Sequence, residues 1–235
     1  MLESQLIIFD CDGVLVDTEP LTNRVLAACV TEAGWAVDSA YSIAHFKGRN
    51  LADILADVEA HLGKQLPDLL DTYRQRMYEE IHQFGVPAMD GIHELLDALD
   101  AMGEDAPHRC IGTNAPLKKA KLTLGGSGLI DRFAHRDRPD QKTMFSAYEV
   151  GQWKPDPGLF LHAAESMGHA PSNCIVVEDS VAGVHAAIAA GMRVIGLADL
   201  TDPKTLQNAG AHAVVESFAI LIEHGNAVFD GAGAR

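Results

Sequence analysis

The stretch that decides the fold is residues 6–18, which read LIIFDCDGVLVDT. A short apolar run, typical of a buried strand, ends here at two acidic residues, Asp10 and Asp12. Residues i and i+2 of an extended segment project to the same side, so both carboxylates are expected to face one crevice at the strand end. Like charges this close repel unless they share a cation or one keeps its proton. The pattern predicts a catalytic acidic pair followed by a sharp turn at Gly13, and the apolar run disfavours the alternative of a surface Asp-x-Asp-Gly turn.

Composition limits the class of protein and its partners. The 235 residues, 47% of them apolar, are enough for one large α/β domain or for a core with a smaller insert. The 18 basic and 33 acidic residues give a net charge of -15, which repels nucleic acid and acidic membrane surfaces. An anionic substrate would therefore need a bound metal and a few well-placed Lys or Arg side chains.

Cysteine usage and hydropathy bear on the cellular compartment. The four cysteines form no C-x-x-C pair, so neither a zinc site nor a disulfide framework is expected. Cys11 alternates to the opposite side of the strand from Asp10 and Asp12, and core packing is favoured over a role as nucleophile. No apolar stretch approaches the roughly 20 residues of a membrane span, and the N-terminus lacks the basic region of a secretion signal. These features predict a cytoplasmic protein with no membrane partner.

Two kinds of pattern divide the chain. After the strand and turn of residues 1–17, residues 18–85 carry helical signals only, including a helix capped by Asn50 over residues 51–62 and another over Pro67–Phe84. From residue 86 onward, helical patterns alternate with short apolar runs, which favours a parallel sheet covered by helices. The expected strands are His108–Thr113, Met144–Ala147, Cys174–Val177, Val194–Leu197 and Ala213–Val215. The charged segment His135–Lys142 contains Pro139 and is predicted to be a solvated loop.

Polar residues follow two of the later elements. Thr113 and Asn114 end an apolar run before a helical pattern, which suits either a phosphate cradle or a helix N-cap. Pro155 biases Lys154 toward an extended conformation, while Asp156 and Pro157 suit the start of the next helix. Lys154 would then be held as a point charge for an anion.

A second acidic pair, Glu178 and Asp179, follows the buried run of residues 174–177. These side chains could cap the next helix, but a second pair of carboxylates at a strand end also supplies the hard oxygen ligands that Mg²⁺ requires. With Asp10 and Asp12 present, the metal site is favoured.

Residues 10–18 resemble the first signature of the haloacid dehalogenase superfamily in its phosphatase branch. The segments around Thr113, Lys154 and Glu178 resemble the second, third and fourth signatures, in the expected order. The resemblance covers the core almost end to end. Within the superfamily, the chain is similar to the phosphoglycolate phosphatase and β-phosphoglucomutase-like subfamily. It implies an α/β fold in which a Rossmann-like parallel sheet core flanked by helices, residues 1–17 and 86–235, carries an inserted all-α cap, residues 18–85. Asp17 and Thr18 would shape the hinge.

The resemblance also implies a reaction. Asp10 would attack phosphorus and become an aspartyl phosphate, which water then hydrolyses. Asp12 would protonate the leaving oxygen as general acid and then deprotonate water as general base. Mg²⁺ would be held by Asp10, the backbone carbonyl of Asp12 and Asp179, with Glu178 binding directly or through water.

The remaining roles concern the substrate, which is expected to be a small phosphorylated metabolite. Thr113, the Asn114 amide and Lys154 would neutralise the transferring phosphoryl oxygens. Substrate choice would lie with the cap, where Lys47, Gly48 and Arg49 occupy the position of the specificity loop, although a solvent-facing basic turn is the alternative. The chain is expected to act as a monomer or weak homodimer.

Two other functions compete with hydrolysis. A β-phosphoglucomutase-like enzyme would carry histidine at position 22 and arginine at position 51, where this chain has Thr22 and Leu51. A non-catalytic binding module would be signalled by loss of the acidic pair or of Lys154, and all three residues are present. A dehalogenase would be expected to lack Asp12.

Overall fold

The computed structural model describes residues 5–46, 49, 51–135, 138, 140–199 and 201–223. The chain divides into two compact units, one made of Met1–Val16 and Ala88–Arg235 and the other of Asp17–Pro87. The second unit contains the expected helical segment 18–85. It interrupts the first unit directly after the first strand and the turn that follows.

The first unit is built on a six-stranded sheet of order β3-β2-β1-β4-β5-β6, in which every neighbouring pair is parallel. The strands are β1 (Leu6–Phe9), β2 (His108–Thr113), β3 (Met144–Ser146), β4 (Cys174–Glu178), β5 (Arg193–Leu197) and β6 (Ala213–Val215). This confirms the predicted α/β fold with a parallel sheet. The third strand stops one residue before the expected Ala147, because Ser146 accepts a hydrogen bond from the Tyr148 amide at 3.2 Å and begins a short helix.

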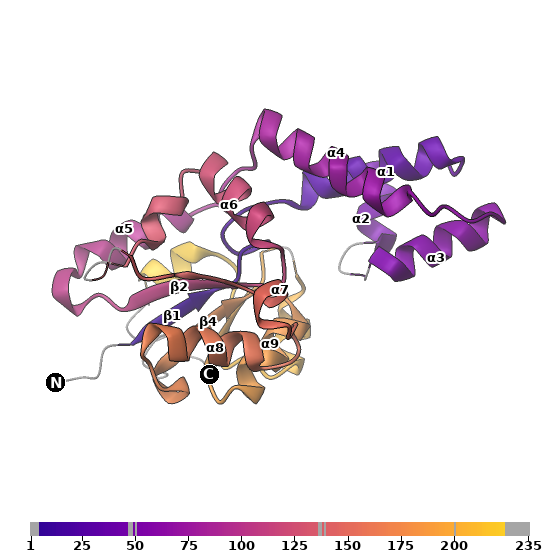
Figure 1. The fold of residues 1–235 in the computed structure, drawn as a ribbon. Coiled ribbons are helices and arrows are strands. Elements are labelled where there is room, and N and C mark those ends of the chain that lie inside the picture. The colour runs from indigo at the N-terminus through magenta and orange to yellow at the C-terminus, as the bar shows by residue number, and fades with distance from the viewer. Residues whose placement is uncertain are drawn as a thin grey trace. The chain divides into compact units, whose positions relative to one another are not determined.

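Helices cover both faces of this sheet, with α8 and α9 over one face and α5 and α6 over the other (Figure 1). Both faces of β1 are therefore buried, which explains its unbroken apolar sequence. On one face Leu6 and Ile8 share a core with Phe160 of α8, and on the other the Phe9 ring packs edge-on against Phe133 with centroids 5.7 Å apart. The helices of this unit are α5 (Ile92–Ala101), α6 (Leu117–Gly126), α7 (Ala147–Val150), α8 (Gly158–Met167), α9 (Val181–Ala189) and α10 (Pro203–Asn208), with 3-10 turns at Gly103–Asp105, Ile130–Phe133 and Pro171–Asn173.

The second unit consists of α1 (Glu19–Ala33), α2 (Ser39–Phe46), α3 (Leu51–Leu62) and α4 (Leu69–Phe84). Inside it the Ser42 hydroxyl donates to Asn23 Oδ1 at 2.8 Å, and the Trp35 ring stacks on His61 with centroids 3.9 Å apart. Helix α4 begins two residues after the expected Pro67, because Pro67 and Asp68 form a turn ahead of it. The predicted cap of α3, Asn50, lies outside the described residues.

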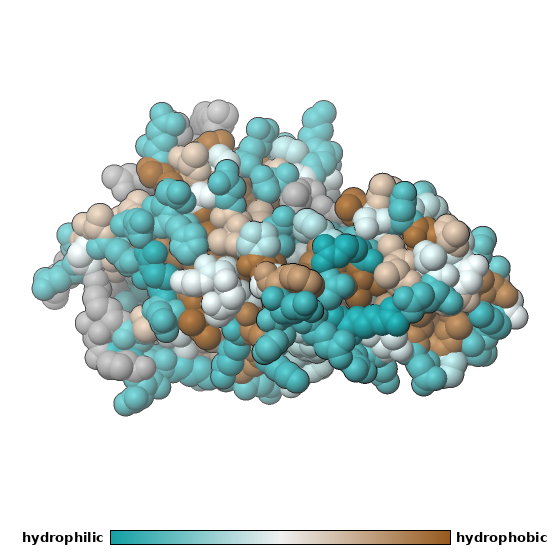
Figure 2. Space-filling model, turned by 90° about the horizontal axis from the view of Figure 1, so that it is seen from above, coloured by the Kyte–Doolittle hydropathy of each residue, from teal (hydrophilic) through white to brown (hydrophobic). Residues whose placement is uncertain are grey.

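The surface carries mainly hydrophilic side chains on the face shown in Figure 2, where apolar residues are scattered. Among the residues that the structure describes, no helix has both the length and the apolar character needed to cross a membrane. The prediction of a solvated loop from His135 is wrong at its first residue, because His135 is only 5% exposed and its ring lies beside that of His108, with centroids 4.7 Å apart.

Candidate active site

The polar residues singled out from the sequence gather at one edge of the sheet. Asp10 directly follows β1, while Thr113 and Glu178 are the last residues of β2 and β4. Strand β1 lies between β2 and β4, so the later strands of the chain are added on both of its sides. In parallel α/β sheets, ligands bind outside the carboxyl ends of the strands at such a switch point.

Lys154 contacts both the residue that follows β1 and the last residue of β4. Its ammonium donates to Asp10 Oδ1 and, at 2.6 Å, to Glu178 Oε1. The lysine side chain is 3% exposed and that of Glu178 is 1% exposed. One oxygen from each of Asp10, Glu178 and Asp179 lies within 4.8 Å of the others. We call these three residues and Lys154 the carboxylate–lysine cluster.

The charges of this cluster are out of balance, because one lysine faces three carboxylates. Burial, opposed by Lys154 and reinforced by Glu178, raises the pKa of Asp10 to about 7. Burial and the neighbouring Glu178 and Asp10 also raise the pKa of Asp179. Burial lowers the pKa of Lys154, but its contacts with Asp10 and Glu178 outweigh this and raise it, so the lysine stays charged. A further positive charge would relieve the carboxylates.

Glu178 is held by the start of α9. Its Oε2 accepts hydrogen bonds from the amides of Asp179 and Ser180, both at 3.1 Å, and from the Ser180 hydroxyl at 2.9 Å. A Cβ at Gly183 would overlap the Glu178 carboxylate, so glycine is needed for this approach. The cap of α9 itself is Ser180, which accepts from the Gly183 amide. Glu178 thus binds the helix start through one oxygen and keeps the other in the carboxylate–lysine cluster.

Thr113 and Asn114 fix the backbone beside Lys154. The Thr113 hydroxyl accepts from the Ala115 amide at 3.0 Å, and Asn114 Oδ1 accepts from the Lys154 amide at 3.0 Å. The alternative that these residues cap α6 is wrong, because the N-cap position is Pro116 and no side chain caps the helix. Asp156 does hold the start of α8, accepting from the Gly158 amide at 2.8 Å.

Asp12 has different surroundings from Asp10. Its carboxylate does not belong to the group of close oxygens formed by Asp10, Glu178 and Asp179. Instead, its Oδ2 lies 2.8 Å from the ammonium of Lys119, which is in the first turn of α6. Lys119 was not among the residues predicted from the sequence, where it is one of three lysines in the helical stretch that follows Asn114.

Gly13 lies against the carboxylate–lysine cluster. It has φ +83, and a Cβ there would overlap the Asp179 carboxylate. Cys11 is buried, and burial together with Asp12 and Asp10 raises its pKa well above the ordinary value. Core packing of Cys11 is therefore confirmed, and the reactive thiolate that a nucleophile needs is disfavoured.

The predicted specificity residues lie in the second unit. Lys47 and Gly48 are outside the described residues. Arg49 forms an ion pair with Asp57 at 2.7 Å, and its side chain is 39% exposed. At the predicted hinge, Asp17 accepts a hydrogen bond from the Glu19 amide at 3.3 Å.

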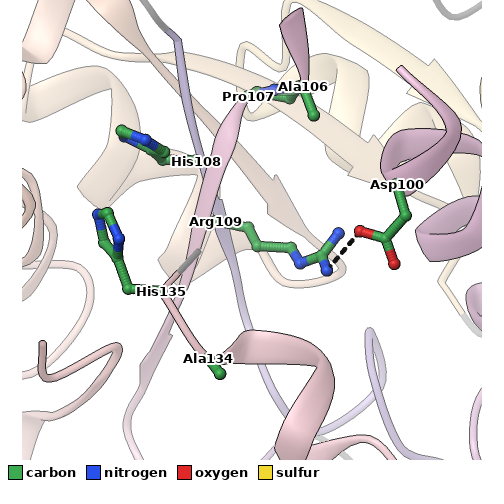
Figure 3. A pocket seen from close by; sticks show the side chains of 7 residues that line it. All are labelled: Asp100, Ala106, Pro107, His108, Arg109, Ala134 and His135. Atoms are coloured by element: carbon green, nitrogen blue, oxygen red, sulfur yellow. Dashed lines mark ion pairs between the residues drawn. The ribbon is translucent and has the colours of Figure 1, made fainter. Parts of the chain in front are cut away.

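A separate cavity of about 60 Å³ lies at the opposite end of β2, lined by His108 and Arg109 from the start of that strand (Figure 3). Arg109 pairs with Asp100 of α5 at 2.7 Å and donates to the Arg132 carbonyl at 2.6 Å. These contacts fasten a helix and a 3-10 turn to the amino end of the strand. The cavity is remote from the carboxylate–lysine cluster, which lies beyond the carboxyl end.

Comparisons with known proteins agree with this geometry. Residues 5–191 match the family model described as haloacid dehalogenase-like hydrolase. The 6-phosphogluconate phosphatase of Escherichia coli is 33% identical over 83% of this chain and 82% of its own length. A phosphorylated carbohydrates phosphatase of Thermotoga maritima is 28% identical over 92% of this chain and 96% of its own. A haloacid dehalogenase family hydrolase of Deinococcus radiodurans, solved with bound phosphate and sodium, superposes with a TM-score of 0.79 at 29% identity over 97% of both chains. The chain therefore belongs to the haloacid dehalogenase-like hydrolase family, as a phosphatase.

Proposed function

We propose that this protein is a magnesium-dependent phosphomonoester hydrolase that acts on a small phosphorylated metabolite through an aspartyl phosphate on Asp10. The observation that carries the proposal is the carboxylate–lysine cluster at the carboxyl end of β1 and β4. A nucleophilic carboxylate, a buried cation and further hard oxygen ligands are the groups that phosphoryl transfer requires.

The residues present fit a divalent cation. Three carboxylates against one lysine leave an excess of two negative charges when all are ionised, and the raised pKa of Asp10 reflects that excess. Asp10, Glu178 and Asp179 would hold the ion together with the backbone carbonyl of Asp12, and oxygen ligands of this kind suit Mg²⁺. When bound, the ion would offset the charge of the transferring phosphoryl group.

The protein's own groups then have separate tasks. Asp10 is the nucleophile, and its contact with Lys154 keeps one carboxylate oxygen in a fixed position. Lys154, the Thr113 hydroxyl and the Asn114 amide bind phosphoryl oxygens, and Asn114 also ties the backbone of Lys154 in place. Asp12, whose side chain is 29% exposed, is the general acid and base.

The substrate class follows from the relatives named above, which act on phosphogluconate and phosphorylated carbohydrates. A phosphoglycolate phosphatase of Thiobacillus denitrificans is a further relative, at 28% identity over 82% of both chains. We therefore expect a sugar phosphate, a sugar-acid phosphate or phosphoglycolate, chosen by the cap through Lys47, Gly48 and Arg49. The mutase reaction is disfavoured because Thr22 stands where a mutase would carry histidine. The Thr22 hydroxyl instead donates to the Thr18 carbonyl at 2.9 Å.

The test is release of inorganic phosphate from these three classes, with Mg²⁺ and with EDTA. We expect Mg²⁺-dependent turnover, ranked by kcat/KM, and no detectable turnover by Asp10→Asn that keeps the wild-type circular dichroism spectrum. Conversion of glucose 1-phosphate to its 6-phosphate without phosphate release would indicate the mutase instead. A wild-type protein that releases no phosphate from any class would refute the proposal, as would a folded Asp10→Asn variant that keeps appreciable activity.

A further inference from the structure

Lys119 is held more firmly than an ordinary surface lysine. Lys119 lies in the first turn of α6. Its amide donates to the Pro116 carbonyl at 2.9 Å, and its carbonyl accepts from the Thr123 hydroxyl at 3.2 Å. The preceding loop is fixed by the Ser146 hydroxyl, which donates to the Ala115 carbonyl at 2.7 Å. Its side chain is 13% exposed. The ammonium group is therefore presented to Asp12 by rigid elements on both sides.

Resting on the function proposed above, we propose that Lys119 is a positioning residue that holds Asp12 in the orientation required for proton transfer to the leaving group. The ammonium lies 2.8 Å from Asp12 Oδ2, and the two residues come from segments 107 positions apart in the chain. Asp12 lies in the turn after β1, where its backbone forms an isolated bridge with Val16. The contact with Lys119 ties its side chain to a second element, α6.

The pair also decides which oxygen can carry the proton. A lysine ammonium has three donors and no acceptor, so the oxygen that it contacts must remain an acceptor. The hydroxyl oxygen of a carboxyl group is a weaker acceptor than its carbonyl oxygen, so the contact at Oδ2 favours Oδ1 as the oxygen that donates the proton. Lys119 thus restricts the direction of the carboxyl group and favours one atom as the donor.

The affected step is the departure of the leaving group. An oxygen of Asp10 forms a bond to phosphorus while the bond from phosphorus to the leaving oxygen breaks, and that bond's electron pair goes to the leaving oxygen. The same oxygen takes the proton of Asp12, which gives an alcohol, the aspartyl phosphate and an ionised Asp12. Later, the oxygen of water bonds to phosphorus, the bond from phosphorus to Asp10 breaks with its electron pair passing to Asp10, and one water proton returns to Asp12. A mispositioned acid impairs the first step most when the leaving oxygen is strongly basic.

The experiment measures kcat/KM for a series of substituted phenyl phosphates, from p-nitrophenyl phosphate to the least acidic phenol. This parameter reports the steps up to loss of the leaving group, so hydrolysis of the aspartyl phosphate does not enter it. For Lys119→Met we expect a loss of about 10- to 100-fold with the least acidic phenol, within the range that general acid catalysis supplies, and less than about 3-fold with p-nitrophenyl phosphate. Lys119→Arg keeps a donor and should restore most of the difference. Lys121→Met, an exposed position on the same helix, is the matched control and should leave the whole series unchanged.

An equal loss across the series would overturn the proposal, because a residue that binds the phosphoryl group or supports the fold affects every leaving group alike. Wild-type values for Lys119→Met would also overturn it. In an Asp12→Asn background, Lys119→Met should cause no further loss, and an additional loss there would mean that Lys119 acts on the substrate directly. Failure of the proposed function would have a different result, because the wild-type protein itself would then be inactive.

Discussion

Replacing Lys154 by methionine should destabilise the protein far more than removal of an ordinary surface lysine. The substitution keeps an unbranched side chain but leaves Asp10 and Glu178 without their shared cation, in surroundings where the lysine is 3% and the glutamate 1% exposed. Removing one partner of a buried ion pair costs about 3–5 kcal/mol, because the remaining charge stays buried and uncompensated. Since this lysine serves two carboxylates, we expect the upper part of that range in EDTA at about pH 8.

The loss should depend on pH. At about pH 5 Asp10 holds a proton in the folded protein, because its pKa is raised to about 7, so less negative charge is left uncompensated. We therefore expect the cost of Lys154→Met to fall at about pH 5. Added Mg²⁺ should also reduce the cost at about pH 8.

The assay is urea unfolding followed by tryptophan fluorescence. The chain contains two tryptophans, Trp35 in the second unit and Trp153 in the first, so a Trp35→Phe background assigns the signal to the unit that carries the change. Lys142→Met is the matched control, because Lys142 pairs with Glu149 at 2.8 Å but both side chains are nearly half exposed. That variant should lose less than about 1 kcal/mol.

Two results would refute the reasoning. A loss for Lys154→Met as small as that of Lys142→Met would mean that the buried carboxylates do not need the lysine. An equally large loss at about pH 5 and about pH 8 would assign the effect to packing, since the lysine ammonium also lies 4.9 Å from the centre of the Phe160 ring.

Three further predictions concern the same region and the cap. In EDTA the urea midpoint of the wild-type protein should fall as pH rises from about 4 to about 7, because the folded state keeps the Asp10 proton that the unfolded state, with a pKa near 3.8, has lost. Stabilisation by Mg²⁺ should therefore be larger at about pH 8 than at about pH 5, and equal stabilisation at both would contradict this. Gly13→Ala should cost about 1–3 kcal/mol in the same assay and lower kcat, because φ is +83 and the new Cβ would displace the Asp179 carboxylate; an unchanged midpoint and kcat would argue against it. Arg49→Ala should change the ranking of sugar phosphates by kcat/KM more than it changes activity on p-nitrophenyl phosphate, and parallel losses on both would exclude a role in specificity.

The fold could be predicted from the sequence because its signals are local. The apolar run of residues 6–9 ends where the structure ends β1, and the alternation from residue 86 onward gives the parallel sheet. Errors arise where a side chain changes the local backbone. Ser146 ends β3 by capping a short helix, and the turn of Pro67 and Asp68 delays α4.

The candidate site was predictable only in part, because no single segment of the sequence indicates which residues of other segments it contacts. Acidic residues at the ends of two predicted strands indicated Asp10 and Glu178, since parallel strands bring their carboxyl ends to one edge. The partner of Asp12 was not indicated, because Lys119 is one of three lysines in α6 and only its position on the helix separates it from Lys118 and Lys121. The burial of His135 was missed for the same reason, since its ring lies beside His108 from another part of the chain.

Two carboxylates separated by one residue thus receive two different lysines, and this difference supports two different roles. Asp10 is buried with Lys154 and two further carboxylates, an environment that holds an oxygen in place and favours a bound cation. Asp12 is more exposed and pairs with Lys119, an environment that suits exchange of a proton with a leaving group or with water. Because both residues follow the end of β1 at Phe9 and Gly13 turns the chain directly after them, the two carboxylates have different surroundings. In the proposed reaction, these different surroundings suit one acid to covalent attack and the other to proton transfer.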